Sequence, residues 1–432
     1  MDYRILPPEE LPEAEIKLPL SKSMSNRALV INALSGLMPE NLKIAGCDDT
    51  RLLAKGIVSG SDEVDIDGAG TAMRFLTAYF SIQPHRKVRL TGNERMCQRP
   101  IRPLVDALRA LGADITYLGE DGFPPLAIKG ASLEGGRLVI DASMSSQYVS
   151  ALLMIAPYLK GGLTLELASE IGSMPYVDMT LEMMRRAGAA AERDRLSIEV
   201  KEGGYTTPAL DIEADWSAAS YWYEIEAVSS GFITLLGLCR DSCQGDSVTA
   251  EIYRQISVTT EFNPDYNGQG PAAELCASPD LSPRLVLDLS SYPDLTPAVA
   301  VTCALVGIPF RLNGLESLRI KECDRLAAIA KELSKLGVEA EIIGDHALEW
   351  TGDRRPMTAL PEFDTYGDHR MAMAFAPVAI YVPGIKIRNV EVVNKSYPEF
   401  WEHLTEAGFT LVDGDTPYES LFNDGRQEDG AR

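Results

Sequence analysis

The stretch "SKSMSNRALVINAL", residues 21–34, begins with serine, lysine, asparagine and arginine and then becomes almost entirely apolar. A hydroxyl-rich start of this kind is typical of a helix that begins at a serine N-cap. The apolar residues surround the predicted helix instead of forming one stripe, so we expect it to be buried. Its cations stand out because the whole chain has a formal net charge of −23.

The same order of a polar or glycine-rich start and a small-residue apolar continuation occurs five more times. The stretches are "GAGTAMRFLTAYF" (68–80), "SMSSQYVSALLMIA" (143–156), "DWSAASYWYEIEAV" (215–228), "DLTPAVAVTCALVG" (294–307) and "GDHRMAMAFAPVAI" (367–380). After the first interval they recur about every 70 to 80 residues, which is too long for a solenoid repeat and suits a βαβαββ unit.

A second set of predicted helices is amphipathic. "RLAAIAKELSKLG" (325–337) places Leu326, Ile329 and Leu333 on one stripe and its charged residues on the other. Related stretches end at glycines suited to the left-handed position after a helix, namely Gly112, Gly188 and Gly408. Each leads into an alternating, strand-like segment, so the chain reads as repeated pairs of a buried and a surface helix with strands between them.

Six such repeats predict an α/β protein of two domains with three units each. We expect residues 21–213 to form one domain and residues 1–20 plus 214–432 the other, because the chain crosses near "AEIKLPL" (14–20) and "PALDIEADWSAAS" (208–220). Residues 262–284 are rich in turn-forming residues and predict a surface excursion. The charged tail, residues 425–432, is expected to be disordered.

Composition excludes several classes of function. No apolar run is long enough to span a bilayer, and the N-terminus lacks a secretory signal, so we expect a cytoplasmic protein without membrane contact. An acidic chain is poorly suited to nucleic acid, whose binding depends on cations. Seven scattered cysteines predict reduced thiols, and the four histidines lack metal-ligand spacing, so no metal is expected.

The six polar helix starts predict an anion site. Each N-terminus exposes unpaired N–H groups and a partial positive charge. If all six meet in a cleft between the domains, that cleft attracts anions without a metal or a phosphate loop, and no G-x-x-x-x-G-K-[ST] motif is present. The polar side chains at these starts and in nearby loops are Lys22, Ser23, Arg27, Thr71, Arg74, Arg99, Ser145, Ser146, Gln147, Asp294, Lys321, Glu322, Arg325, His369, Arg370 and Lys395.

Taken in order, these motifs resemble the 5-enolpyruvylshikimate-3-phosphate synthase family of enolpyruvyl transferases. The matching motifs are "SKSMSNRAL", "GAGTAMR", "RPI", "SSQYVSALLMIAP", "PYVDMTL", "KECDRL", "YGDHRMAMAF" and "NKSYPEF", between residues 21 and 400. The resemblance implies a two-domain inside-out α/β prism that closes over its ligands. It also implies transfer of the enolpyruvyl group of phosphoenolpyruvate to the 5-hydroxyl of shikimate 3-phosphate, with release of phosphate, on the route to chorismate and the aromatic amino acids.

The resemblance also assigns the binding residues. Around shikimate 3-phosphate it implies Lys22, Ser23, Arg27, Ser145, Ser146, Gln147, Ser173, Tyr176, Asp294 and Lys321. For phosphoenolpyruvate it implies Lys22, Gly70, Thr71, Arg99, Gln147, Arg325, Arg370 and Lys395. The first domain would thus carry most contacts to shikimate 3-phosphate, and the second would clamp phosphoenolpyruvate. No metal or organic cofactor is implied, a monomer suits two moving domains, and glyphosate is the expected inhibitor.

For the chemistry we expect Asp294 to accept the proton of the 5-hydroxyl, and Glu322 or Lys22 to protonate the methylene carbon of phosphoenolpyruvate. His369 completes the catalytic set, as a polar group at a helix start. Departures from the family pattern are Gly68 in place of Asn, Phe75 in place of Pro, Met174 in place of Lys and Ser317 in place of Asn. They bear on affinity and on glyphosate sensitivity.

Two other functions are compatible with parts of the pattern. UDP-N-acetylglucosamine enolpyruvyl transferase shares the fold and the donor, but its cysteine loop has no match here, and Cys97 is the only thiol near that position. A non-catalytic anion-binding protein on the same fold would be expected to lose Lys22, Asp294 or Glu322, and all three are present.

Overall fold

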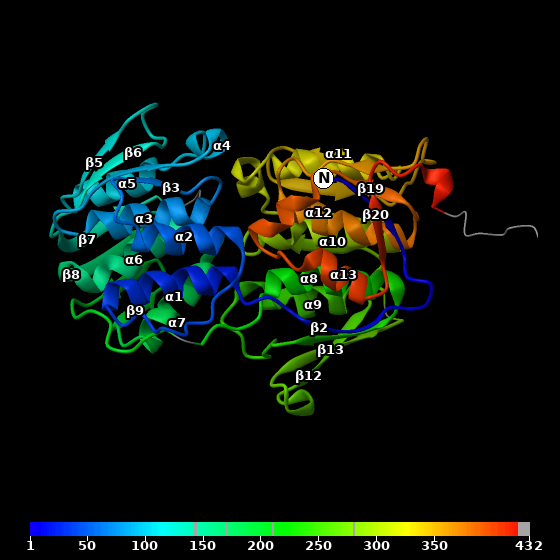
Figure 1. Cartoon of the computed structure of the whole chain (residues 1–432), viewed down its shortest axis with the longest axis horizontal. Coiled ribbons are helices and arrows are strands. Elements are labelled where there is room, and N and C mark those ends of the chain that lie inside the picture. The colour runs from blue at the N-terminus through cyan, green and yellow to red at the C-terminus, as the bar shows by residue number, and fades with distance from the viewer. Residues whose placement is uncertain (142–144, 170–171, 210, 280, 422–432) are drawn as a thin grey trace, which may run out of the picture.

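The computed structural model describes residues 1–141, 145–169, 172–209, 211–279 and 281–421. The chain forms two lobes that lie side by side (Figure 1). One apolar core contains residues between 24 and 209, and the other contains residues 5–18 and 214–409. We call the lobes around these cores the N-lobe and the C-lobe. The domain boundaries predicted above stay a prediction that this division supports, and the tail, residues 425–432, lies outside the described residues.

The architecture is mixed α/β, and in the described residues five four-stranded sheets share one pairing order. In each sheet, the first two strands pair in parallel, and the other two strands are added antiparallel. This pattern is found in the two sheets of the N-lobe and in the three sheets of the C-lobe. Parallel neighbours need a crossover connection, and a buried helix supplies it in each unit.

The N-lobe contains two of these units. The first consists of β3 (Glu63–Asp65), α3 (Gly70–Ser81), β4 (Lys87–Thr91), α5 (Arg102–Ala110), β5 (Asp114–Tyr117) and β6 (Leu126–Lys129), with α4 (Glu94–Cys97) after β4. The second consists of β7 (Glu134–Ile140), α6 (Ser146–Ile155), β8 (Lys160–Leu167), α7 (Met174–Arg186), β9 (Ala191–Asp194) and β10 (Ser197–Val200). Two further helices, α1 (Lys22–Ser35) and α2 (Asp48–Val58), pack beside them.

The C-lobe contains the other three units. The first consists of β2 (Glu13–Lys17), α8 (Trp216–Ser229), β11 (Phe232–Leu236), α9 (Thr249–Arg254), β12 (Val258–Asn263) and β13 (Ala272–Ala277). The second consists of β14 (Leu285–Asp288), α10 (Thr296–Val306), β15 (Phe310–Asn313), α11 (Arg325–Ser334), β16 (Glu341–Ile343) and β17 (Ala347–Trp350). The third consists of β18 (Glu362–Phe363), α12 (His369–Phe375), β19 (Ile385–Ile387), α13 (Phe400–Glu406), β20 (Thr410–Asp413) and β1 (Tyr3–Leu6). Short 3-10 turns relevant to the site are η2 (Gly245–Val248), η4 (Pro293–Leu295), η5 (Glu316–Ile320) and η7 (Val390–Lys395).

The N-lobe is inserted into the C-lobe. The chain enters it after β2 and returns to α8, and β2 and β11 pair in parallel across the insertion. The two crossing segments hold each other, because Leu20 and Ala214 form an antiparallel bridge and the Ser21 amide donates to the Glu213 carbonyl at 2.8 Å. The lobes are therefore joined by a double strand, which suits a hinge.

The structure corrects one expectation from the sequence and adds detail to a second. The unit expected to begin at Ser21 has no four-stranded sheet in the described residues, since residues 36–47 between α1 and α2 contain no strand. Residues 262–284, expected to be a turn-rich surface excursion, include the end of β12 and all of β13. The turn-forming residues lie between these two strands, which pair as a hairpin that extends from the C-lobe in Figure 1.

Local signals for the helices agree with the structure. Ser21, Ser145, Asp215 and Asp368 each cap a helix by accepting a backbone N–H with the side chain. The three glycines predicted at helix ends, Gly112, Gly188 and Gly408, have φ of 95°, 95° and 91°. None of the described helices is both long and apolar enough to cross a membrane.

The buried helix α8 contains two acidic side chains in the core, Glu224 and Glu226. Burial raises the pKa of Glu226 to about 8, so this group binds a proton in the folded protein that it releases in the unfolded chain at neutral pH. The cost to folding is absent below the ordinary pKa of 4.5, grows as the pH rises above that value, and is complete once the pH exceeds about 8.

We therefore expect Glu226→Gln to raise the free energy of unfolding by about 2 kcal/mol at pH 8, after allowance for screening, and by almost nothing at pH 4. Urea unfolding at both pH values measures this, with the exposed Glu261→Gln as the control. An equal gain at both pH values would show that ionisation of Glu226 is not the cause.

Candidate active site

The starts of the buried helices meet at the boundary between the lobes. A cavity lies at this boundary, and side chains at the helix starts line it. They are Lys22 and Ser23 of α1, Thr71 of α3, Ser146 and Gln147 of α6, Ser217 of α8, Asp294 just before α10, and Arg370 of α12. Helix N-termini present unpaired N–H groups and partial positive charge. The cavity is thus suited to anions before any side chain is considered.

We call this cavity of about 90 Å³ the serine pocket. All ten residues that the resemblance places around shikimate 3-phosphate line it: Lys22, Ser23, Arg27, Ser145, Ser146, Gln147, Ser173, Tyr176, Asp294 and Lys321. Four of the serines come from the N-lobe, and Ser217, Ser317 and Ser396 add hydroxyl groups from the C-lobe. Hydroxyl and cationic groups together can bind a polyhydroxylated, phosphorylated ring.

Arg27 is a buried cation of the serine pocket. Its Nε donates to the Thr180 hydroxyl at 2.7 Å, and its Nη1 donates to the Ser23 carbonyl at 2.9 Å. Burial lowers its pKa to about 10, so the guanidinium stays charged at neutral pH. Within the described part of the chain Arg27 has no carboxylate within ion-pair distance, which leaves its charge available to an anion.

A smaller cavity of about 50 Å³ adjoins the serine pocket, and we call it the arginine pocket. It is lined by Lys22, Asp49, Gly70, Thr71, Arg99, Gln147, Asp294, Lys321, Glu322, Arg325, His369 and Arg370. Seven of the eight residues expected to hold phosphoenolpyruvate are among them, and Lys395 lines the neighbouring outer cavity instead. The absence of a side chain at Gly70 lets the Arg99 guanidinium approach the start of α3 closely, since a Cβ at this position would lie 2.7 Å from Arg99 Nη1.

Asp294 lies where the two pockets meet. Its carboxylate pairs with Arg325 Nη1 at 2.9 Å and Arg370 Nη2 at 2.8 Å, and Lys321 Nζ lies 3.6 Å away. Burial opposes ionisation of Asp294, but these three cations, Arg370 first, outweigh it and hold its pKa well below the usual range. The group is therefore an ionised carboxylate at the centre of the site.

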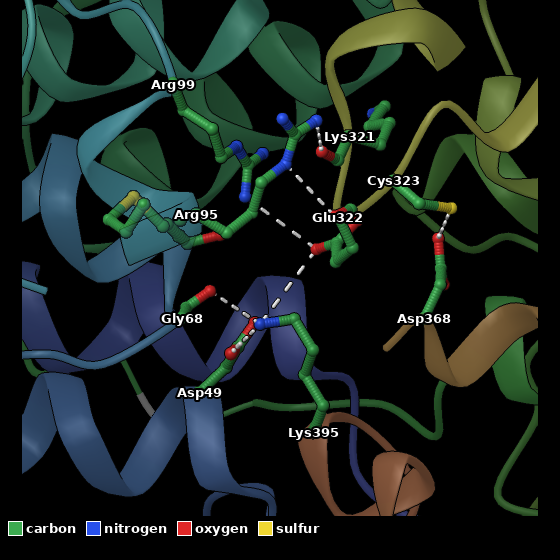
Figure 2. A network of polar contacts seen from close by, with 12 residues as sticks. Asp49, Gly68, Arg95, Arg99, Lys321, Glu322, Cys323, Asp368 and Lys395 are labelled. Atoms are coloured by element: carbon green, nitrogen blue, oxygen red, sulfur yellow. Dashed lines mark hydrogen bonds and ion pairs between the residues drawn. The ribbon is translucent and has the colours of Figure 1, made fainter. Parts of the chain in front are cut away.

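Glu322 occupies the arginine pocket as a second carboxylate. Arg325 Nη2 lies 3.1 Å from its Oε2, and both Arg99 Nη1 and Lys395 Nζ lie 3.9 Å from its Oε1 (Figure 2). Burial would raise the pKa of Glu322, but the surrounding cations bring it well below the usual range. The carboxylate thus stands between cations that can equally bind a phosphate or a carboxylate ligand.

Two lysines from different lobes share the carboxylate of Asp49, at the start of α2. Lys395 Nζ of the C-lobe is 2.8 Å from Asp49 Oδ1 and donates to the Gly68 carbonyl at 2.7 Å (Figure 2). Lys22 Nζ is 3.2 Å from Asp49 Oδ2. Burial lowers the pKa of Lys22, but Asp49 more than compensates, so the net pKa is raised and Lys22 is protonated.

His369 is buried at the start of α12 and lines the arginine pocket. Burial, together with Lys22 and Arg370, brings its pKa well below the usual range, so the imidazole is neutral at pH 7. Both ring nitrogens lack a hydrogen-bond partner among the described residues. A neutral imidazole that faces a cavity can bind a ligand group or pass a proton to one.

One cation expected at the site has a different role, and several acids were missed. Arg74 lines neither pocket and donates to the carbonyls of Gly70 and Pro100, so it holds α3 against the following loop. Asp49 and Asp368 were not singled out, because an acid at a helix start reads as a cap. Asp368 is indeed the cap of α12, but it also binds Arg325 Nε at 2.8 Å.

Fold and site together define a two-lobed α/β protein with a cationic, anion-binding cleft between its lobes. Residues 8–404 match a family model described as EPSP synthase (3-phosphoshikimate 1-carboxyvinyltransferase). A protein of that name from Bacteroides fragilis is 46% identical over 419 residues, which are 96% of this chain and 100% of the relative. One from Shewanella amazonensis is 34% identical over 94% of this chain and 98% of the relative.

Among solved structures, an EPSP synthase from Acinetobacter baumannii superposes with a TM-score of 0.73 at 22% identity, over 95% of this chain and 100% of that one. At this identity the likeness concerns the fold. The family model and the relatives together show that the chain belongs to the EPSP synthase family.

Proposed function

We propose that the protein is a 3-phosphoshikimate 1-carboxyvinyltransferase, which transfers the enolpyruvyl group of phosphoenolpyruvate to the 5-hydroxyl of shikimate 3-phosphate and releases phosphate. Membership of the family supports the reaction class. The observation that carries the proposal is the pair of adjoining pockets, one rich in hydroxyl groups and one rich in arginine, with Asp294 on the wall of both.

We assign shikimate 3-phosphate to the serine pocket. Arg27 supplies a cation that has no carboxylate partner among the described residues, and Ser23, Ser145 and Ser146 supply hydroxyl donors for the phosphate. Asp294 and Lys321 at the far wall are suited to the ring hydroxyls, since one accepts and the other donates. The half-buried Cys97, the thiol nearest to the position of the sister enzyme's cysteine loop, is occupied in a contact with the Gly92 carbonyl.

Phosphoenolpyruvate belongs in the arginine pocket. Its carboxylate and phosphate require several cations. The cations in and beside this pocket, around the carboxylates of Glu322 and Asp294, are Arg99, Arg325, Arg370, Lys22 and Lys395. Guanidinium groups bind such anions bidentately. The bound substrate would take over part of the ion pairing that the two carboxylates now satisfy.

The reaction then proceeds by addition and elimination. Asp294 takes the proton of the 5-hydroxyl as the oxygen attacks C2 of phosphoenolpyruvate, while Glu322 or Lys22 gives a proton to C3. The tetrahedral intermediate next returns a proton from C3 to the group that donated it, and the bond from C2 to the phosphate oxygen breaks, so that phosphate leaves with the proton held by Asp294. The cations and helix N-termini stabilise the negative charge at each stage.

The double strand between the lobes suits opening and closing, and we propose the inside-out α/β prism for the whole architecture, with the five sheets as support. We also propose that the protein works as a monomer of 47.1 kDa, because each lobe contributes side chains to both pockets.

The test is phosphate release from purified protein with phosphoenolpyruvate and either shikimate 3-phosphate or UDP-N-acetylglucosamine. We expect release only with shikimate 3-phosphate. Release only with the nucleotide sugar, or with neither acceptor, would overturn the proposal.

We expect glyphosate to compete with phosphoenolpyruvate, because its carboxylate and phosphonate can pair with the same cations. The apparent KM for phosphoenolpyruvate should rise linearly with glyphosate while kcat stays constant. We expect Gly68 to bear on the strength of inhibition, because it lies beside Lys395: a Cβ there would be 3.1 Å from Asn93 Nδ2 and 3.8 Å from Lys395 Nζ. Steady-state kinetics at several glyphosate concentrations measure this, and inhibition that is independent of phosphoenolpyruvate concentration would contradict it.

A further inference from the structure

Arg95 of α4 joins the two lobes through main-chain carbonyl groups. Its Nη2 donates to the Lys321 carbonyl at 3.0 Å, and its Nε donates to the Glu322 carbonyl at 3.2 Å (Figure 2). Arg95 belongs to the N-lobe, and the two carbonyls belong to the C-lobe turn whose side chains line the arginine pocket. The Arg95 guanidinium of the N-lobe is thus hydrogen-bonded to two consecutive site residues of the C-lobe.

Both sides of this contact are held firmly. In the N-lobe, Asn93 caps α4 by accepting the Met96 amide at 2.9 Å and donates to Asp67 at 2.8 Å. In the C-lobe, Asp324 follows the gripped turn, caps α11 and pairs with Arg319 at 2.7 Å. The two hydrogen bonds therefore connect two ordered segments, so they are sensitive to the relative position of the lobes.

The contact is suited to repeated opening. Arg95 is exposed, and no ion pair involves it among the described residues, so water can replace both carbonyls when the lobes separate. Hydrogen bonds from a charged donor to neutral carbonyls are strong enough to favour the closed form without making it permanent. By contrast, Arg325 and Arg370 inside the arginine pocket are buried and paired with carboxylates.

We infer that Arg95 is a closure latch, a positioning residue that sets the Lys321–Glu322 turn over phosphoenolpyruvate when the lobes close. The inference rests on the proposed function and assigns Arg95 no contact with substrate. It acts through the main chain of Glu322, whose carboxylate is a candidate proton donor, and of Lys321, which reaches Asp294. Closure of the lobes would thus place the side chains of Lys321 and Glu322 at the same time.

The test uses Arg95→Gln and Arg95→Lys in the full chain. For Arg95→Gln we expect kcat/KM for phosphoenolpyruvate to fall about tenfold to fiftyfold, with kcat also lowered, because two charge-assisted hydrogen bonds of the closed form are lost. The dissociation constant of shikimate 3-phosphate without phosphoenolpyruvate should be unchanged. Arg95→Lys should recover part of the loss, since an ammonium group can reach one carbonyl.

The matched control is Arg102→Gln. Arg102 is also exposed and also donates to a carbonyl, that of Asp121 at 2.8 Å, but within the N-lobe. Its kinetics should stay within about twofold of the parent protein. Small-angle scattering gives the second readout: the parent and Arg102→Gln should contract when shikimate 3-phosphate and glyphosate are added, and Arg95→Gln should contract less.

Unchanged kinetics in Arg95→Gln would overturn the latch, and so would full contraction of that variant together with lost activity. Neither result would affect the proposed function, which depends on phosphate release by the parent protein. Conversely, a parent protein that releases no phosphate would refute the proposed function before the variants are compared.

Discussion

Asp294→Asn is expected to lower kcat about 10³-fold, the loss typical when a positioned general base is removed. The asparagine keeps the size of the side chain and can still accept a hydrogen bond, but it cannot take the proton of the 5-hydroxyl. In the parent protein the Asp294 pKa lies well below its usual range, so the carboxylate is ionised at neutral pH and has a free site for a proton. Single-turnover phosphate release should fall by the same factor as kcat, because the chemical step is affected.

The control for this substitution is Asp288→Asn, on the exposed end of β14 six residues earlier, where Asp288 accepts the Ser290 amide at 2.9 Å. It should leave turnover near the parent value. Circular dichroism is needed as well, because Arg325 and Arg370 lose a buried partner in Asp294→Asn. A folded Asp294→Asn protein whose turnover is within about tenfold of the parent would remove Asp294 from the role of base.

The local parts of this fold are readable from sequence. Ser21 and Asp215 cap their helices, and Gly112 adopts a positive φ after α5, because these are short-range effects of single residues. The pairing of the strands is not local. β1 lies between β19 and β20, and β2 pairs with β11, so two N-terminal strands complete sheets whose other strands come from much later in the chain. No pattern near residue 3 or residue 13 indicates those partners.

The site divides in the same way. Its cations and hydroxyls stand at helix starts and in the loops beside them, where sequence pattern and resemblance both point. The acids that pair with them were harder to find: Asp49 follows another aspartate at the start of α2 and looks like a helix-end charge, yet it binds lysines from both lobes. Arg95 has no sequence signal that separates it from any exposed arginine, because its role depends on which carbonyls the other lobe brings to it.

The ion pairs around Glu322 have a consequence for its protonation. Burial raises the pKa of Glu322, but Arg99, Lys395 and Arg325 together lower it by more, so the carboxyl group is ionised in the ligand-free protein. A donor of a proton to C3 must first hold one. When the two anionic groups of phosphoenolpyruvate pair with these cations, they weaken the influence that lowers the pKa, while burial continues to raise it. Substrate binding should therefore be accompanied by uptake of a proton at Glu322.

Glu322→Gln is accordingly expected to lower kcat about 10²-fold and to change the pH dependence. In the parent protein kcat/KM for phosphoenolpyruvate should fall as the pH rises, because the proton taken up by Glu322 comes from solution. The glutamine cannot ionise, so this part of the fall should disappear. Proton uptake can be measured directly with a pH indicator in weak buffer, in the Asp294→Asn background, where chemistry is slow and binding of phosphoenolpyruvate is observed alone.

Lys22 is the other candidate donor, and the two can be separated. Lys22 is already protonated before substrate binds, because Asp49 raises its pKa, so donation by Lys22 requires no uptake of a proton. If Glu322→Gln retains both its turnover and the parent pH dependence, the proton comes from Lys22. If proton uptake is present in Asp294→Asn and absent once Glu322→Gln is added, the carboxylate is the group that binds the proton, since nothing else distinguishes the two proteins.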